Sequence, residues 1–237
     1  MTRTAGAPIG CQRPSRFWGL GCPKIYHEAE DTLGHAIQAA PDHHLSCENF
    51  PQHPMAHQYP DIPDHLKAFI GRQKIFFVGT AAETGRVNIS PKGMDSLRVL
   101  GDNRVIWLNV TGSGNETSAH VQNNQRMTLM FAAFEGNPMI LRLYGTARVV
   151  HKNDSDWNEL YAWFHPMPGA RQIFDLDVDL VQTSCGMGVP LFDYREERNQ
   201  LGPWAENKGA DGIEEYWREK NQTSLDGLPT HIIDRNT

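Results

Sequence analysis

Regular alternation of hydrophobic and polar positions begins near residue 55 and continues along most of the chain that follows. Short runs rich in aromatic and β-branched residues, each bounded by Gly, Asn, Asp or Ser, predict β-strands joined by hairpins. We expect strands at 74–82, 86–90, 97–100, 105–110, 127–134 and 139–150. Sequential hairpins imply antiparallel pairing, so the pattern predicts a small antiparallel barrel.

Helical periodicity is confined to a few segments. The spacing of Leu66, Phe69 and Ile70 predicts an amphipathic helix over 64–72. One helix is expected inside the strand region and two after it, at 116–124, 154–164 and 213–221. Because strands do not alternate regularly with helices, a doubly wound dinucleotide-binding sheet is disfavoured.

Residues 1–54 have no lasting helical or strand period and are rich in Pro and His. We expect a disordered or non-native leader here, with Met55 as the biological start and one folded domain over 55–237. Side chains of metal-ligand type also occur, at His43, His44, Cys47, His53 and His57. Their spacing matches no standard zinc pattern, so a solvated tail is favoured.

Composition and charge exclude several classes of protein. The net charge of -6 argues against a general nucleic-acid binder, which needs a basic surface. No apolar run approaches the roughly 20 residues of a membrane span, and the N-terminus lacks a secretory apolar stretch. Four cysteines, three of them in the leader, do not make a disulfide framework. We therefore expect a cytoplasmic protein without a membrane partner.

The most unusual polar segment is the loop Thr111-Gly112-Ser113-Gly114-Asn115-Glu116-Thr117. Its two glycines let the backbone approach a ligand closely, and its Ser, Asn and Thr side chains supply hydrogen-bond donors. Because a helix follows, free backbone N–H groups would also point into the loop, as in phosphate sites. The loop is neither a P-loop nor a dinucleotide fingerprint. The alternative is a plain strand-to-helix turn, capped by Ser113 or Asn115.

A second polar face follows the strand at 86–90. Asn88 and Ser90 share one side of the strand by the period of two, and Lys92 projects a cation beyond Pro91. We expect this side to meet a ligand, a partner subunit or water. Arg142, inside an apolar strand, would bind an anion or a carboxylate across a dimer interface, or extend to solvent.

Two further segments carry weaker candidates. Cys185 is expected to be a small buried group rather than a nucleophile, since a nucleophile needs a basic neighbour. Asp175, Asp177 and Asp179 alternate along one side of a strand, where a solvated face is favoured over a divalent-metal site.

Several ungapped motifs, in order, resemble the pyridoxamine 5'-phosphate oxidase-like FMN-binding family: FFVGTA, RVNISPKG, WLNVTGSGNETSAHV, RMTLMF, ILRLYGTARV, SCGMGVP and NQTSLDGLPT. The resemblance covers about 55–229 and leaves the leader outside. It implies a split β-barrel, mainly β with peripheral helices and a C-terminal helical tail. It also implies a homodimer that holds FMN at the subunit interface.

The resemblance further implies which residues hold the cofactor. These are Asn88, Ser90, Lys92, Thr111, Ser113, Asn115, Thr117 and Arg142. The first three would contact the isoalloxazine and ribityl groups, and the loop residues would hold the phosphate. Arg142 would lie on the flavin-facing side of its strand.

This chain also departs from the pyridoxamine 5'-phosphate oxidases themselves. Their Arg-Lys pair at the start of the inserted helix is replaced by Asn115-Glu116-Thr117, so backbone N–H groups or the cations Lys92 and Arg126 would have to compensate. Their C-terminal Trp and Arg, which close over the pyridoxal substrate, are not matched, so that activity is not expected. The hypothesis is an FMN-dependent oxidoreductase, supplied with hydride by NAD(P)H or a small-molecule substrate. The alternative is a non-catalytic module that holds a flavin or haem for storage or sensing.

Overall fold

The computed structural model describes residues 56–237, which lie in a unit that spans Phe50–Thr237. The expected leader, the start at Met55 and four of the five side chains of metal-ligand type lie outside the described residues. Only His57 of that group is described, in the first strand.

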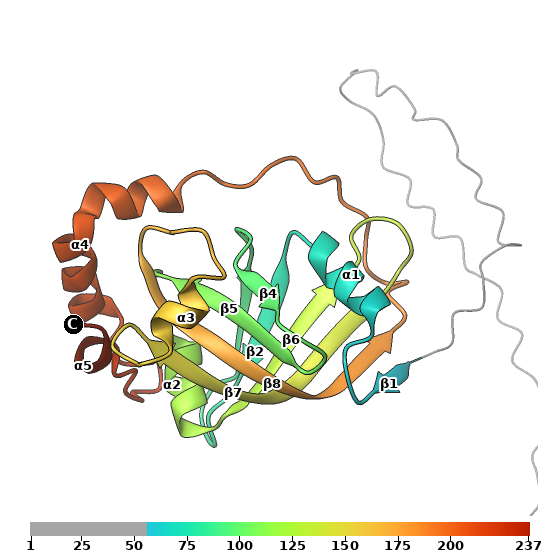
Figure 1. Ribbon diagram of the computed structural model, residues 1–237, viewed down its shortest axis with the longest axis horizontal. Helices are drawn as coiled ribbons and strands as arrows, with labels where there is room; N and C mark the ends of the chain where they lie inside the picture. The colour runs from blue at the N-terminus through green and yellow to red at the C-terminus, as the bar shows by residue number, and fades with distance from the viewer. Residues whose placement is uncertain (1–55) are drawn as a thin grey trace, which may run out of the picture. The chain divides into compact units, whose positions relative to one another are not determined.

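Eight strands form the body of the protein: β1 (His57–Tyr59), β2 (Phe76–Thr80), β3 (Asn88–Lys92), β4 (Leu97–Val99), β5 (Arg104–Val110), β6 (Arg126–Ala132), β7 (Ile140–His151) and β8 (Ala170–Ser184). They make one antiparallel sheet in the order β3-β2-β6-β7-β8-β5-β4, with β1 added to β8. The sheet curls into a half-barrel (Figure 1). The fold is thus a split barrel, as the sequence predicts.

Five helices surround the sheet: α1 (Asp64–Arg72), α2 (Glu116–Asn123), α3 (Trp157–Tyr161), α4 (Leu201–Lys220) and α5 (Ile232–Asn236). Helix α1 turns its apolar stripe of Leu66, Phe69 and Ile70 into the core, as its spacing predicts. Helix α4 is kinked at Gly209, which has a positive φ of 66°. None of the helices in residues 56–237 has the length and apolar character needed to cross a lipid bilayer.

The main core fills the inside of the curled sheet. Trp107 stacks on Phe174 with 4.5 Å between the ring centroids, and Phe76 stacks on Phe131 at 5.9 Å. A second cluster lies on the other side of β5 and β8, where α3 covers it with Trp157. Both faces of the long central strand β8 are therefore buried over its first half.

The register of the β2–β3 hairpin positions the polar side of β3. Thr80 lies opposite Asn88, and Val78 lies opposite Ser90. Directly paired residues point to the same side of a sheet. Because Val78 is buried, the side chains of Asn88 and Ser90 lie on the inner side, at the open edge of the barrel.

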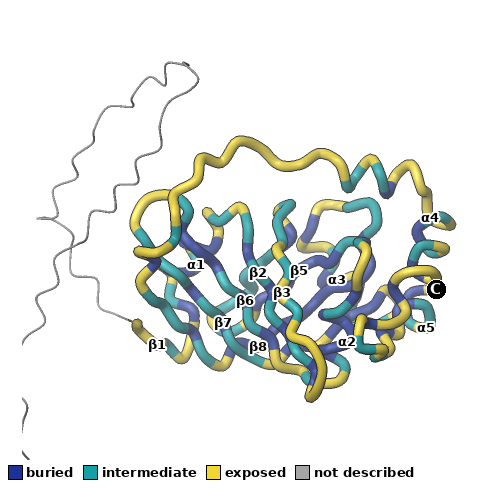
Figure 2. The backbone as a smooth tube through the Cα atoms, turned by 180° about the vertical axis from the view of Figure 1, so that it is seen from behind, coloured by how far each residue is buried: buried dark blue, intermediate teal, exposed yellow. Residues whose placement is uncertain are grey.

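The C-terminal part of the chain leaves β8 and returns to the opposite end of the barrel. Residues 191–200 are all exposed, and Figure 2 shows this connection as a continuous exposed run above the sheet. Helices α4 and α5 then pack together through Ile213, Trp217 and Ile232. This tail lies against α2 and β7 (Figure 1).

Candidate functional site

A polar cavity of about 510 Å³ opens where the edge strand β3 meets the loop before α2. Seven of the eight expected cofactor-binding residues line it: Asn88, Ser90, Lys92, Thr111, Ser113, Asn115 and Thr117. Two segments that are separate in the sequence therefore form one site. The eighth residue, Arg142, is not part of this lining.

Hydrogen bonds join the two segments at the cavity wall. The hydroxyl of Ser90 donates to Asn88 Oδ1 at 3.2 Å, and Asn88 Nδ2 donates to Thr117 Oγ1 at 3.3 Å. This chain of contacts fixes the side chains of β3 against the first turn of α2. The period of two along β3 was sufficient to predict that Asn88 and Ser90 lie on one side of the strand.

Lys92 brings a cation to the cavity without a hydrogen-bonded partner among residues 56–237. Its ammonium group lies 5.3 Å from the centre of the Trp107 ring. Burial, and then the positive charge of Arg171, lower the pKa of Lys92 to about 8. A bound anion would raise the pKa of Lys92 again.

Arg171, at the start of β8, is the second cation of the cavity and was not expected from the sequence. Its side chain is buried, with 3% of the residue exposed. Its guanidinium donates to the carbonyl of Gly114 and to Oδ1 of Asn221, both at 2.7 Å. Burial lowers the pKa of Arg171 to about 9, so the group is still charged at neutral pH. Both partners are neutral.

The loop residues differ in what they can offer a ligand. The hydroxyl of Thr111 donates to the carbonyl of Gly169 at 2.7 Å and accepts from Trp217 Nε1 at 2.8 Å. Its hydrogen-bonding capacity is therefore used within the protein. Ser113 is exposed at the rim. Asn115 is the N-cap residue of α2, as in the plain-turn alternative, but its side chain makes no capping hydrogen bond, and its buried Oδ1 has no partner in the described chain.

Glu116 also lines the cavity, but its carboxylate is engaged by the C-terminal tail. Both carboxylate oxygens accept from the backbone N–H of Leu225, at 3.1 and 3.0 Å. The side chain thereby fastens the C-terminal tail to α2. Arg126, considered above as a compensating cation, is exposed and donates to Asn124. Arg171 lines the cavity, whereas Arg126 does not.

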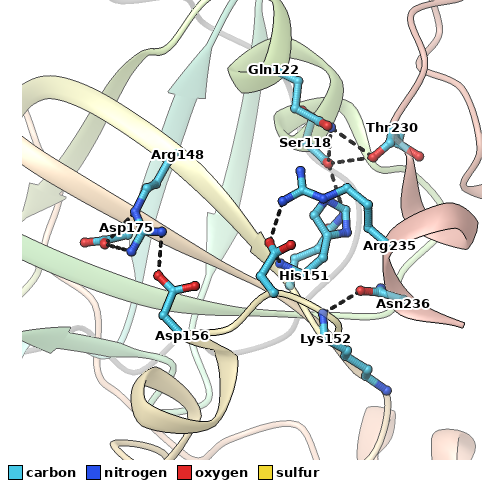
Figure 3. A network of polar contacts seen from close by, with 12 residues as sticks. Ser118, Gln122, Arg148, His151, Lys152, Asp156, Asp175, Thr230, Arg235 and Asn236 are labelled. Carbon is cyan, nitrogen blue, oxygen red and sulfur yellow. Dashed lines mark hydrogen bonds and ion pairs between the residues drawn. The ribbon is translucent and has the colours of Figure 1, made fainter.

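The C-terminal tail braces the site from behind. Figure 3 shows Thr230 beside Ser118 and Gln122 of α2, whose side chains both donate to its carbonyl. In the turn after β7, the backbone N–H of Lys152 donates to Asn236 Oδ1 at 2.8 Å. The loop and the first turn of α2 are thus held in place by residues far along the chain.

A second, larger cavity of about 1890 Å³ continues from the first. The two share lining residues, among them Lys92 and Gly112. Aromatic side chains line the larger one, including Phe69, Phe134 and Trp204. Cys185 also lines it and is exposed, so the expectation of a buried thiol was wrong. Its position at the end of β8 leaves it outside the core.

The aspartates of β8 do not form a metal site. Asp175 is buried and accepts hydrogen bonds from Arg104 and Arg148 at 2.7–3.0 Å. Burial alone would raise the pKa of Asp175, but the two guanidinium groups outweigh it and hold the pKa below its usual range. Asp177 and Asp179 are exposed, as expected. In residues 56–237, no group of three or more His, Cys, Asp or Glu side chains could hold a metal ion.

Arg142 lies on the side of β7 that faces away from the core. Its Nη1 donates to the hydroxyl of Ser184 at 3.1 Å. The neighbouring Tyr144 donates to Gln182 on the same side of the sheet. The prediction that Arg142 contacts the flavin therefore needs a second subunit.

The curled antiparallel sheet, with a polar cavity between its edge strand and an inserted helix, defines a protein of the split-barrel class. The profile described as "Pyridoxamine 5'-phosphate oxidase" matches residues 62–185. The chain belongs to the pyridoxamine 5'-phosphate oxidase family.

Sequence similarity to a second protein of the family supports this assignment. The pyridoxamine 5'-phosphate oxidase family protein ustO of Aspergillus flavus is 38% identical over 195 residues, which cover 72% of this chain and 76% of that protein. Among solved structures, a pyridoxamine 5'-phosphate oxidase-related, FMN-binding protein of Nostoc punctiforme is 14% identical with a TM-score of 0.40, over 53% and 81% of the two chains. HutZ, the haem storage protein of Vibrio cholerae, is 16% identical with a TM-score of 0.37, over 53% and 97%. The structural likenesses concern the fold.

Proposed function

We propose that the chain binds FMN in the cavity between β3 and α2 and acts as an FMN-dependent oxidoreductase. The observation that carries this proposal is the pair of cations Lys92 and Arg171, which face one cavity with neutral or aromatic partners. A buried cation and a half-buried one that face the same cavity destabilise each other, and a bound anion relieves that cost. A phosphate monoester carries close to two negative charges at neutral pH and matches the pair.

The rest of the cavity suits the remainder of an FMN molecule. Its volume of about 510 Å³ falls in the range of small-ligand sites, roughly 300–1,000 Å³. The Asn88 and Ser90 side chains offer hydrogen bonds to ribityl hydroxyls and to the polar edge of the ring. FMN would supply the redox chemistry, and the chain would bind, orient and shield it. A cation near the ring, such as Arg142 of a second subunit, would favour the reduced anion.

The larger cavity supports catalysis over storage. Its volume exceeds that of a typical small-molecule site and it continues from the cation pair. A second molecule, either NAD(P)H or a small substrate, can therefore reach a flavin bound beside Lys92. We propose a cytoplasmic homodimer as the working form, in which Arg142 of one subunit lies near the flavin of the other.

The test is a titration of the purified protein with FMN, followed by flavin absorbance or fluorescence. Changing Lys92→Ala together with Ser113→Ala is expected to weaken FMN binding by about 2–4 kcal/mol, from one charged and one neutral hydrogen bond. Unchanged affinity would show that the loop is only a turn. Reduction of the bound flavin by NADH or NADPH, with reoxidation by air, separates an oxidoreductase from a storage module.

A further inference from the structure

Asn221 is a buried junction between the tail and the cation of the cavity. It follows directly after α4 and has no exposed surface. Its Nδ2 donates to the carbonyl of Gly112 at 3.0 Å, and its Oδ1 accepts from Arg171 Nη1 at 2.7 Å. One amide thus bonds both the glycine loop and the guanidinium, and uses its two ends for different partners.

Arg171 differs from several other arginines of this fold in the charge of its hydrogen-bond partners. Arg104 and Arg148 are less buried, and both bond the carboxylate of Asp175. Arg235 pairs with Asp154. Arg171, although more buried than any of these, bonds only neutral groups among residues 56–237: the carbonyl of Gly114, the side-chain oxygen of Asn221 and, with its amide correctly oriented, that of Asn109. Burying a cation without a counter-charge is costly, so such an arrangement is typical of a site that meets an anion.

We infer that the neutrality of the Asn221 side chain permits phosphate specificity: the amide supports Arg171 at the cavity without a counter-charge and leaves the guanidinium charge available to a phosphate monoester. Asn221 is a positioning residue, because it acts through Arg171 and through the loop carbonyl. The inference rests on the proposed function in that the phosphate is the one carried by FMN. It predicts that the chain distinguishes FMN from riboflavin, which has the same ring and ribityl chain without the phosphate.

The geometry makes one substitution decisive. Asn221→Asp has nearly the same shape, but it places a carboxylate within 2.7 Å of Arg171 Nη1. That carboxylate would neutralise the guanidinium inside the protein and repel the phosphate. Asn221→Ala loses the same two hydrogen bonds and adds no charge. The pair of variants therefore separates the effect of charge from the effect of lost support.

The experiment measures dissociation constants of the full chain for FMN and for riboflavin by quenching of flavin fluorescence. In Asn221→Asp, we expect the preference for FMN over riboflavin to fall by at least about tenfold, the value of one charge-assisted contact. In Asn221→Ala, the preference stays within about threefold of the original while thermal stability falls. A preference unchanged in Asn221→Asp, or reduced equally by both variants, overturns the inference.

Arg171→Gln tests the same claim from the other side of the contact. It removes the charge and leaves Asn221 neutral, so the preference for FMN is expected to fall as in Asn221→Asp, with riboflavin affinity unchanged. Equal losses of FMN and riboflavin affinity would show that Arg171 is only structural, and would contradict the inference.

A different set of results would show that the chain does not bind FMN although the phosphate site exists. If the original chain binds neither flavin, inorganic phosphate alone becomes the probe, read as the shift in thermal unfolding midpoint. Phosphate that stabilises the original chain and Asn221→Ala, but not Asn221→Asp, supports the phosphate site without FMN. No phosphate-dependent shift in any of the three overturns the inference as well.

Discussion

Lys92 gives the site a pH dependence that follows from its surroundings. Its pKa is lowered to about 8 by burial and by the charge of Arg171, and a bound phosphate would raise it again. The protein then takes up a proton as it binds FMN above pH 8. We expect the FMN dissociation constant to be flat from pH 7 to about 8 and then to rise toward tenfold per pH unit.

A Lys92→Arg variant is the control for this prediction. Its guanidinium stays charged to a higher pH than an ammonium group, so the rise of the dissociation constant should begin near pH 9, where Arg171 titrates, and not near pH 8. Fluorescence titrations at half-unit steps measure both proteins. The same slope in both would show that Lys92 is not the titrating group.

Glu116 lines the proposed phosphate cavity but has a structural partner in the C-terminal tail. Because its carboxylate bonds the backbone N–H of Leu225, Glu116→Gln should change FMN affinity by less than about twofold. The variant should lose about 0.5–1 kcal/mol of unfolding free energy, since an amide oxygen accepts more weakly than a carboxylate. Urea unfolding and FMN titration measure the two quantities. A large gain in FMN affinity would show that Glu116 opposes the phosphate after all.

At the scale of residues, the sequence predicts the part of the site that lies on regular or glycine-rich segments. Asn88, Ser90 and Lys92 follow the period of the strand, and the loop follows from its composition. Arg171 and Asn221 are distant in sequence and meet only through the tertiary fold. A lone Arg among buried positions was the one signal available for Arg171, and the strand that contains it was not predicted in full.

Elements were predictable where hairpins and amphipathic periods are local. The β2–β3 and β4–β5 hairpins and the bounds of α1 match the expectation closely. Strand β8 is largely buried on both sides over its first half, so it lacks a simple alternation, and only its aspartates were noticed. Strand β1, the first half of α4 and α5 were not predicted, since each depends on distant partners.

The junction of β7 and β8 contains a bulge that requires a glycine. The register shifts between Tyr144 and Gly145, and a Cβ at Gly145 would overlap the carbonyl of Asp177. Gly145→Ala should therefore cost about 2–3 kcal/mol of unfolding free energy, as overpacked sites do. Gly101→Ala is the control, because nothing lies near its Cβ position. Equal urea midpoints for the two variants would contradict this account of the bulge.

The buried His151 at the end of β7 should make the folded protein less stable at acidic pH. His151 is fully buried, neither ring nitrogen has a partner in the described chain, and Figure 3 shows it near Arg235. Burial, then the charge of Arg235, lower its pKa to about 4 from 6.5, although Asp154 opposes this. The unfolded chain thus binds more protons between these values, and stability falls as the pH drops from 6.5 toward 4.

The free energy of unfolding should fall by about 3 kcal/mol between neutral pH and a pH at which His151 is protonated in both states, because one unit of pKa difference corresponds to about 1.4 kcal/mol. Urea unfolding at pH 7 and at pH 4.5 measures it. His151→Leu, which cannot titrate, should lose less stability over the same interval. An identical pH dependence in the two proteins would assign the effect to other groups.

At the scale of the whole molecule, two exposed apolar side chains at the edge strand β3 bear on the proposed homodimer. Val87 and Ile89 are 71% and 69% exposed and point away from the cavity that Asn88 and Ser90 line. Exposed apolar side chains beside a ligand site are typical of an interface. We expect light scattering to give a dimer, and Ile89→Lys to shift it toward a monomer with weaker FMN binding. A monomer that binds FMN fully would contradict the interface.

The most direct test of the whole account is the visible absorption spectrum of the purified chain after FMN is added and free flavin is removed by desalting. We expect the purified chain to retain a flavin spectrum with about one FMN per chain, and Arg171→Gln to lose it at the same protein concentration. A colourless original protein, folded by its thermal transition yet unable to retain FMN, would contradict the claim that the cations Lys92 and Arg171 form a flavin-phosphate site.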